Sequence, residues 1–311
     1  MFLFRACLKC LVMLPFCLLM AQAPVAAKET AAPLAKAADL ENVRATCQKI
    51  GNKLSSVNPQ ECLERGLQVS GAQSVKGVPL LVKEYSPKAG QRPQARIMLI
   101  GGTHGDEYSS VSVVFKWMKI LDAHHSGLFH WQVVPLLNPD GLLQKPAKRT
   151  NANGVDLNRN FATNDWAKES LAYWVKHTKQ DPRRYPGKTA LSEPESRWLA
   201  QEIERFRPDV IVSVHAPYNL LDFDGPPDAS PKRLGNIYLS LLGTFPGSMG
   251  RYAGMMKNIP VITIELPNAQ SLPPPAETQK IWADLVHWLR THARSRTLTA
   301  NAAVLVNQTG M

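Results

Sequence analysis

A short glycine-rich turn follows an apolar run in this sequence. Residues 97–100 (IMLI) are typical of a buried strand, and residues 101–107 read GGTHGDE. Glycines let the chain turn sharply after the strand. The turn therefore places His104 and Glu107, with two residues between them, where both could close on one divalent metal ion. Hydrolytic zinc sites commonly use three such ligands and keep a fourth position for water.

The rest of the chain alternates strand and helix patterns. The predicted strands are 78–85, 95–100, 129–137, 209–214 and 260–266, and the predicted helices are 39–57, 108–123, 192–206 (with Ser192 as its N-cap) and 277–290. This alternation predicts an α/β fold, with a mixed, largely parallel sheet covered by helices on both faces. Residues 141–192 are expected to form one long irregular connection, which is often functional.

Composition narrows the possible partners. The chain has 311 residues, of which 44% are hydrophobic, so it can bury the core of one large domain or two small ones. Its net charge is +11, but it has no dense Lys/Arg run and only 7% aromatic residues, so we expect no nucleic-acid partner. A basic surface would suit cell-wall polymer or phospholipid head groups, or it could serve solubility alone.

The N-terminus has the pattern of a secretory signal peptide. Arg5 and Lys9 precede an apolar stretch, 10–20, that is too short to span a bilayer comfortably. Small residues then lead to a cleavage site near Ala27, so residues 1–27 are the predicted signal peptide. No later segment approaches transmembrane length. We therefore expect a periplasmic or secreted protein without stable membrane insertion.

Signal removal would leave two cysteines, Cys47 and Cys62. In an exported chain such a pair suggests one disulfide, although two separately buried thiols are the alternative. We expect three parts after the signal peptide: an N-terminal segment over 28–77 with this disulfide, a main domain over 78–294 and a flexible tail over 295–311.

Several polar residues stand where burial is costly or where loops begin. His215 directly follows the predicted strand 209–214, and Glu265 interrupts the apolar run ITIEL. A carboxylate there is costly to bury unless it is functional or forms a structural salt bridge. Asn158 and Arg159 lie side by side in a loop, where a guanidinium can clamp a carboxylate. A loop held by Asx turns, with a surface arginine, is the alternative.

Five segments together resemble the zinc carboxypeptidase family. In chain order they are GGTHGDE, NPDG, RTNANGVDLNRNF, SVHAP and ITIELP. The resemblance covers roughly 78 to 294, the predicted main domain. Within the family, HAPYNLLDFDGPP and GSMGRYAG are similar to the bacterial murein peptide amidase A branch.

This resemblance implies one Zn²⁺ ion as cofactor and a fixed set of catalytic roles. His104, Glu107 and His215 match the zinc ligands of the family. Glu265 matches the general base, which takes a proton from water. Arg149 matches the arginine that polarises the scissile carbonyl and stabilises the oxyanion.

The resemblance also implies where substrate binds. Asn158 and Arg159 match the residues that hold the terminal carboxylate. Arg251 lies near the family's specificity position and could pair with an acidic group such as that of a diaminopimelate side chain, or it could be a solvated surface residue. The chain departs from digestive members at the tyrosine that caps the bound carboxylate, because no tyrosine has the matching spacing before Gly247 and Ser248.

We therefore expect a zinc metallocarboxypeptidase or amidase that hydrolyses an amide bond next to a free carboxylate. The expected substrate is a small peptide, specifically the D-glutamyl–diaminopimelate bond of peptidoglycan stem peptides. Two alternatives are an N-acyl amino acid deacylase of the aspartoacylase and succinylglutamate desuccinylase type, and a non-catalytic wall-binding protein. The oligomeric state stays open.

Overall fold

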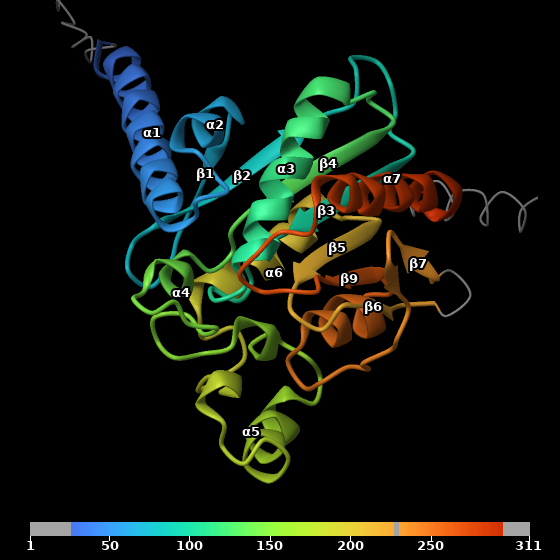
Figure 1. Ribbon diagram of the computed structural model, residues 1–311. Helices are drawn as coiled ribbons and strands as arrows, with labels where there is room; N and C mark the ends of the chain where they lie inside the picture. The colour runs from blue at the N-terminus through green and yellow to red at the C-terminus, as the bar shows by residue number, and fades with distance from the viewer. Residues whose placement is uncertain (1–25, 227–229, 295–311) are drawn as a thin grey trace, which may run out of the picture. The chain divides into compact units, whose positions relative to one another are not determined.

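The computed structural model describes residues 26–226 and 230–294 (Figure 1). The chain divides into two compact units, Met1–Ala38 and Asp39–Met311, and the sheet lies in the second. Residues 1–25 of the predicted signal peptide and all of the predicted tail, 295–311, lie outside the described residues. Among the described helices, none combines the length and apolar character that a membrane span requires.

A seven-stranded sheet forms the centre of the second unit, in the order β1-β2-β4-β3-β5-β9-β6. The four central strands β4, β3, β5 and β9 are parallel, and the pairs β1–β2, β2–β4 and β6–β9 are antiparallel. The prediction of a mixed, largely parallel sheet is therefore confirmed. The strand bounds are β1 Gln68–Gln73, β2 Pro79–Tyr85, β3 Ala95–Ile100, β4 Phe129–Val134, β5 Val210–His215, β6 Leu220–Asp224 and β9 Val261–Glu265, with a small separate pair, β7 Arg233–Leu234 and β8 Ile237–Tyr238.

Helices cover both faces of this sheet, because successive strand residues point to opposite sides. In β3, Ile97 and Leu99 face the core beneath helices α3 and α7, whereas Met98 and Ile100 face α6. The helices are α1 Ala26–Lys53, α2 Pro59–Glu64, α3 Tyr108–His124, α4 Pro139–Leu143, α5 Trp166–Lys176, α6 Pro194–Phe206 and α7 Pro275–His292, with short 3₁₀ turns η1 Leu157–Arg159 and η2 Pro182–Arg184 and a π-helix, η4 Gly250–Met256.

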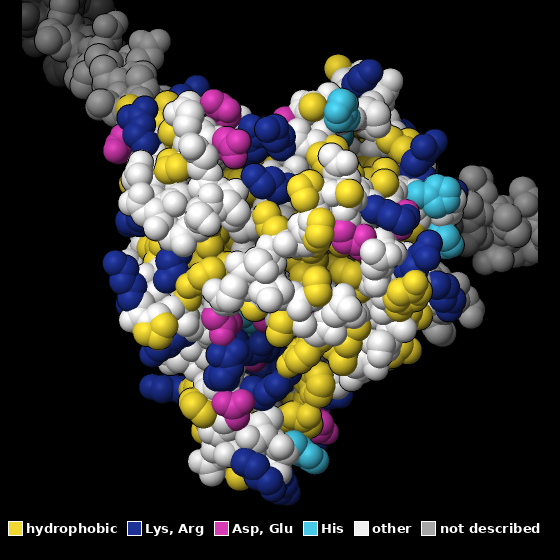
Figure 2. Space-filling view, in the orientation of Figure 1, with side chains coloured by type: hydrophobic (Ala, Val, Ile, Leu, Met, Phe, Trp, Pro, Cys, Tyr) yellow, Lys and Arg dark blue, Asp and Glu magenta, His cyan; other side chains and the backbone are white. Residues whose placement is uncertain are grey.

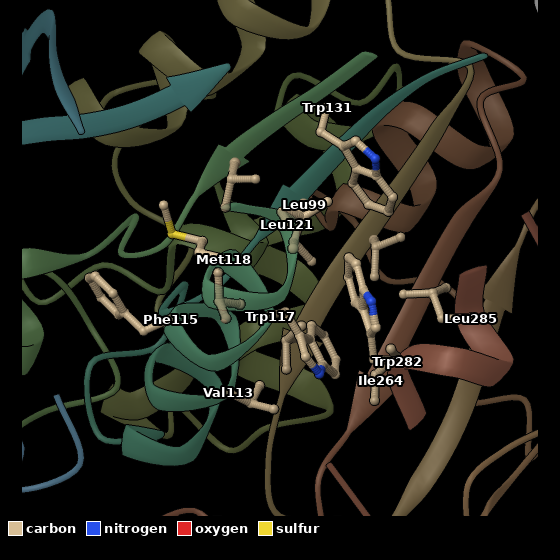
Figure 3. Close-up of a cluster of buried hydrophobic side chains, with 14 of the residues drawn as sticks. Leu99, Val113, Phe115, Trp117, Met118, Leu121, Trp131, Ile264, Trp282 and Leu285 are labelled. Carbon is tan, nitrogen blue, oxygen red and sulfur yellow. The ribbon is translucent and has the colours of Figure 1, made fainter. Parts of the chain in front are cut away.

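Three tryptophans anchor the core on the α3 and α7 side. Trp117 of α3 lies beside Trp282 of α7, with their ring centroids 5.4 Å apart (Figure 3). Trp131 of β4 lies 5.2 Å from the same Trp282 ring. Aromatic side chains bury large apolar areas, so this cluster fixes both helices on the sheet.

The predicted disulfide is present. Cys47 of α1 bonds to Cys62 of α2, and both side chains are fully buried. The bond closes a loop of 15 residues, for which the chain-entropy model gives about 3 kcal/mol of stabilisation. It thus ties the second-unit part of α1 to the region before β1.

Two predictions from the sequence were wrong in detail. Ser192 does not cap α6, because the helix begins at Pro194 with Glu193 at its N-cap, and the Ser192 hydroxyl instead donates to the Glu193 carboxylate. The stretch 141–192 is not irregular throughout, since it contains α4, η1, α5 and η2.

Candidate metal and substrate site

The ends of three parallel strands bring the predicted metal and base residues together. His104 and Glu107 lie in the turn after β3, while His215 and Glu265 end β5 and β9 and pair with each other in register. Carboxyl ends of parallel strands share one edge of a sheet, where ligands of α/β proteins bind. The turn needs glycine at Gly105, because a Cβ there would overlap the backbone of α4.

Three buried side chains converge on one point. His104 Nδ1 lies 2.7 Å from Glu107 Oε1, and His215 Nδ1 lies 3.1 Å from both His104 Nδ1 and Glu107 Oε2. Their ligand atoms all fall within 4.8 Å of one another. Zinc–ligand distances of about 2 Å place neighbouring ligand atoms roughly 3.3 Å apart, so this group fits a zinc ion. Two imidazole nitrogens and a carboxylate are also the donors that zinc prefers.

Asp156 orients this group and was not predicted. Its Oδ1 lies 3.1 Å from His104 Nε2, and its Oδ2 accepts from Arg149 Nε at 3.0 Å. Burial raises the pKa of Asp156, but the charges of Arg149 and His104 outweigh burial and hold the pKa well below its usual range. A charged carboxylate behind the ring keeps Nδ1 of His104 directed at the metal position.

Ser213 performs the same task for the other imidazole. Its hydroxyl lies 3.0 Å from His215 Nε2, on the side of the ring opposite the ligand atoms. Each histidine therefore has its outer nitrogen occupied by a neighbour, which fixes the ring orientation.

Glu265 lies at the same end of the sheet and lines a cavity together with His104 and His215. Its side chain is 6% exposed, and among the described residues no Lys, Arg or His nitrogen lies within ion-pair distance of it. A structural salt bridge therefore does not account for this buried carboxylate. Burial, together with the charge of Glu107, raises the pKa of Glu265, which suits a group that must take up a proton.

The cavity also collects the cationic and amide groups expected to bind substrate. Arg149, Asn158 and Arg159 all line it, joined by Arg184 of η2, which was not predicted. Figure 2 shows Lys and Arg side chains gathered with Asp and Glu side chains above α5, beside a group of hydrophobic side chains.

Arg159 is a buried cation without a carboxylate partner among the described residues. Its Nη1 donates to the Asn158 carbonyl at 2.7 Å, its guanidinium stacks 4.5 Å from the Phe245 ring centroid, and its Nε has no hydrogen-bond partner. Burial lowers the pKa of Arg159 to about 10, so the side chain keeps its charge at neutral pH. Such a group gains most from a ligand that supplies a carboxylate.

Arg251 does not reach this cavity. Its guanidinium pairs with Asp165 and lies 3.7 Å from Glu169, at the start of α5, while its neighbours Met249 and Gly250 line the cavity instead. The π-helix that begins at Gly250 presents Arg251 to α5. An acidic substrate group would have to displace Asp165 to bind this residue.

Two further carboxylates line the cavity and were missed from the sequence, Asp222 and Asp224 of β6. The segment LLDFD alternates apolar and acidic residues, so the strand could have been recognised by its period of two. Leu221 and Phe223 face the apolar core on the other side of the sheet.

Comparisons with known proteins agree with this geometry. Residues 67–224 match the zinc carboxypeptidase family. The chain is 34% identical over 205 residues to murein peptide amidase A of Vibrio campbellii, covering 64% of this chain and 78% of that protein. It is 31% identical over 240 residues to murein peptide amidase A of Escherichia coli, covering 72% and 93%.

A solved structure shares the fold. Carboxypeptidase A from Helicoverpa armigera superposes with a TM-score of 0.56 at 18% identity, over 73% of this chain and 68% of that one. The family match over half of the sequence, with relatives above 30% identity along most of their length, shows that the chain belongs to the zinc carboxypeptidase family of zinc hydrolases.

Proposed function

We propose that this chain is an exported carboxypeptidase or amidase that uses one zinc ion to hydrolyse the D-glutamyl–diaminopimelate bond of peptidoglycan stem peptides. The observation that carries the proposal is one cavity lined both by the metal and base residues and by arginines, of which Arg159 has no carboxylate partner among the described residues. The names of the two bacterial relatives, murein peptide amidase A, support the substrate class.

The positions of the side chains support the following catalytic roles. Zinc, when bound by His104, Glu107 and His215, supplies a Lewis acid. Glu265 accepts a proton from the attacking water on a carboxylate oxygen and passes it to the leaving amine nitrogen. Arg149, held by Asp156, stabilises the negative charge that develops on the scissile carbonyl oxygen.

Substrate orientation is assigned to Asn158 and Arg159. The Asn158 Oδ1 accepts from the Met249 backbone N–H at 2.8 Å, which fixes the amide plane at the cavity wall. The Arg159 guanidinium then provides charge-assisted hydrogen bonds to the free carboxylate beside the scissile bond. Together these residues select substrates that are cleaved at a chain end.

Export is supported by the signal-like N-terminus and by the disulfide between Cys47 and Cys62. Disulfides persist in oxidising compartments, which favours a periplasmic or secreted protein. That location would place the enzyme next to peptidoglycan. The net charge of +11 would also favour approach to an anionic wall polymer.

The test is incubation of the purified protein with a muramyl tripeptide ending in diaminopimelate, with and without a chelator. We expect release of free diaminopimelate that the chelator abolishes and zinc restores. Release of ordinary C-terminal amino acids without release of diaminopimelate would reject the substrate. Activity on N-acyl amino acids alone would indicate a deacylase, and zinc binding without turnover would indicate a wall-binding protein.

A further inference from the structure

Three neighbouring strands line one wall of the cavity with alternate polar side chains. His215 and Glu265 stand at the ends of β5 and β9, and on the antiparallel strand β6 Asp222 lies opposite Thr263. Asp224 is the next residue of β6 on the same face. The wall therefore runs from the catalytic carboxylate to a pair of aspartates.

Neither aspartate is neutralised by the protein. Among residues 26–226 and 230–294, no Lys, Arg or His forms an ion pair with Asp222 or Asp224. Asp222 Oδ1 accepts a hydrogen bond from the Leu242 backbone N–H at 2.9 Å. Asp224 is 8% exposed, lines the cavity and accepts no hydrogen bond from another described residue.

The backbone holds Asp224 in this position. Its carboxylate lies against Gly250, where any Cβ would overlap Oδ2, and Gly254 of the same π-helix packs on its Cβ. The carboxylate is thus confined between β6 and η4. Burial, together with the charge of Asp222, raises the pKa of Asp224 to about 7, and burial also raises the pKa of Asp222. Both shifts reflect carboxyl groups that are removed from water and that no cation of the described residues stabilises in the charged form.

The spacing suits an amino-acid side chain. Strand residues rise about 3.4 Å each, so Asp222 lies about 7 Å and Asp224 about 14 Å along the strand from the level of Glu265. Arg159 and the other arginines line the same cavity, where they would attract the carboxylate of the substrate rather than its ammonium. A four-carbon stem ending in an ammonium would extend from the scissile bond to the level of Asp222, on the side that faces Asp224.

We propose that Asp222 and Asp224 bind the side-chain ammonium of the leaving amino acid and so determine specificity. This specificity depends on the proposed hydrolysis. The released amino acid would carry an ammonium at the end of its side chain, as lysine and diaminopimelate do. Arg251, which is held by Asp165, has no part in this recognition.

The first test needs only the unmodified protein. Three γ-D-glutamyl peptides that end in meso-diaminopimelate, lysine or norleucine are compared, because lysine and norleucine differ chiefly in the ammonium. We expect kcat/KM for lysine to exceed that for norleucine by about 30-fold or more, the cost of leaving a buried charge without its partner. Free lysine should also inhibit more strongly than free norleucine.

The second test uses Asp224→Asn and Asp222→Asn, with Asp284→Asn on the outer helix α7 as matched control. We expect the lysine-to-norleucine ratio of kcat/KM to fall at least tenfold in either cavity variant and to stay unchanged in the control. Thermal unfolding and zinc content confirm that each variant is folded. A higher kcat/KM for the diaminopimelate peptide than for the lysine peptide would still support the proposal, provided that kcat/KM for the lysine peptide exceeds that for the norleucine peptide.

Two results would overturn the proposal. One is equal cleavage of the lysine and norleucine peptides by the unmodified protein. The other is a parallel loss on all three peptides in folded variants. Failure to cleave any of the peptides would instead reject the proposed hydrolysis, so the two failures are distinguishable.

Discussion

Asp156 and His104 form a buried pair, with 3.1 Å between the carboxylate Oδ1 and Nε2 of the ring. The pair fixes which nitrogen of His104 is left for a metal, because the outer nitrogen is already engaged. Since Asp156 also accepts from Arg149, one carboxylate positions both a candidate metal ligand and the Arg149 guanidinium.

Replacement of this carboxylate should weaken metal binding. We expect Asp156→Asn to lower zinc affinity about 10- to 100-fold, the usual effect of losing an outer partner of a ligating histidine. Zinc affinity is measured by competition with a chromogenic chelator, with Asp284→Asn as control. An unchanged affinity would show that Asp156 does not orient His104.

Glu265→Gln separates proton transfer from metal binding. The substitution keeps the shape of the side chain but removes the base, so kcat should fall by about 10²- to 10⁴-fold. Zinc content should stay at the level of the unmodified protein, because Glu265 is not one of the three converging ligands. Measurement of kcat beside metal analysis checks this, and a variant that lost its zinc would assign Glu265 to the metal instead.

The positions of His104, His215 and Glu265 could be predicted because each is a polar residue at or just after the end of an apolar strand, whereas their metal and base roles were implied by the resemblance to the zinc carboxypeptidase family. His215 and Glu265 are the last residues of β5 and β9, and His104 follows β3 within a glycine-rich turn. A parallel sheet brings the carboxyl ends of its strands to one edge, whatever the conformation of the connecting loops. The largely parallel character of the sheet followed from the alternation of strands with helices, whereas the order of the strands was not predicted.

Other residues were not placed from the sequence, for different reasons. Asp156 lies in a loop without periodicity, and its role depends on contacts with His104 and Arg149. For Arg251 the sequence left a substrate contact and a surface position open, because its partners Asp165 and Glu169 lie at the start of α5, a helix that the sequence did not predict. Asp222 was overlooked because β6 is a short edge strand whose polar face lines a cavity rather than solvent.

Arg159 and Arg251 should respond differently to the same substitution. Arg159→Gln removes the unpaired cation of the cavity, so kcat/KM for a peptide with a free carboxylate should fall about 30-fold or more. Arg251→Gln breaks an ion pair with Asp165 outside the cavity, and its kcat/KM should stay within about threefold. Steady-state kinetics on one peptide tests both. An equal loss of kcat/KM in the two variants would show that Arg251 also binds substrate.

Glu195 should make the stability of the fold depend on pH. It is fully buried at the start of α6, and its carboxylate accepts from the Asn151 side chain at 3.1 Å and the Val75 N–H at 3.3 Å. Burial raises its pKa from 4.5 to about 7, although these hydrogen bonds lower it in part. The folded protein therefore holds the proton more tightly than the unfolded chain does.

The sign of the effect follows from this shift. The contribution of Glu195 to the free energy of unfolding is complete below its unfolded pKa of 4.5 and is lost as the pH rises through about 7. The loss is at most about 3 kcal/mol, since one pKa unit corresponds to about 1.4 kcal/mol. Glu195→Gln cannot ionise and should lack this loss. Urea unfolding at pH 5 and pH 8 should therefore show a smaller fall in stability for the variant, whereas parallel falls in the two proteins would place the titration elsewhere.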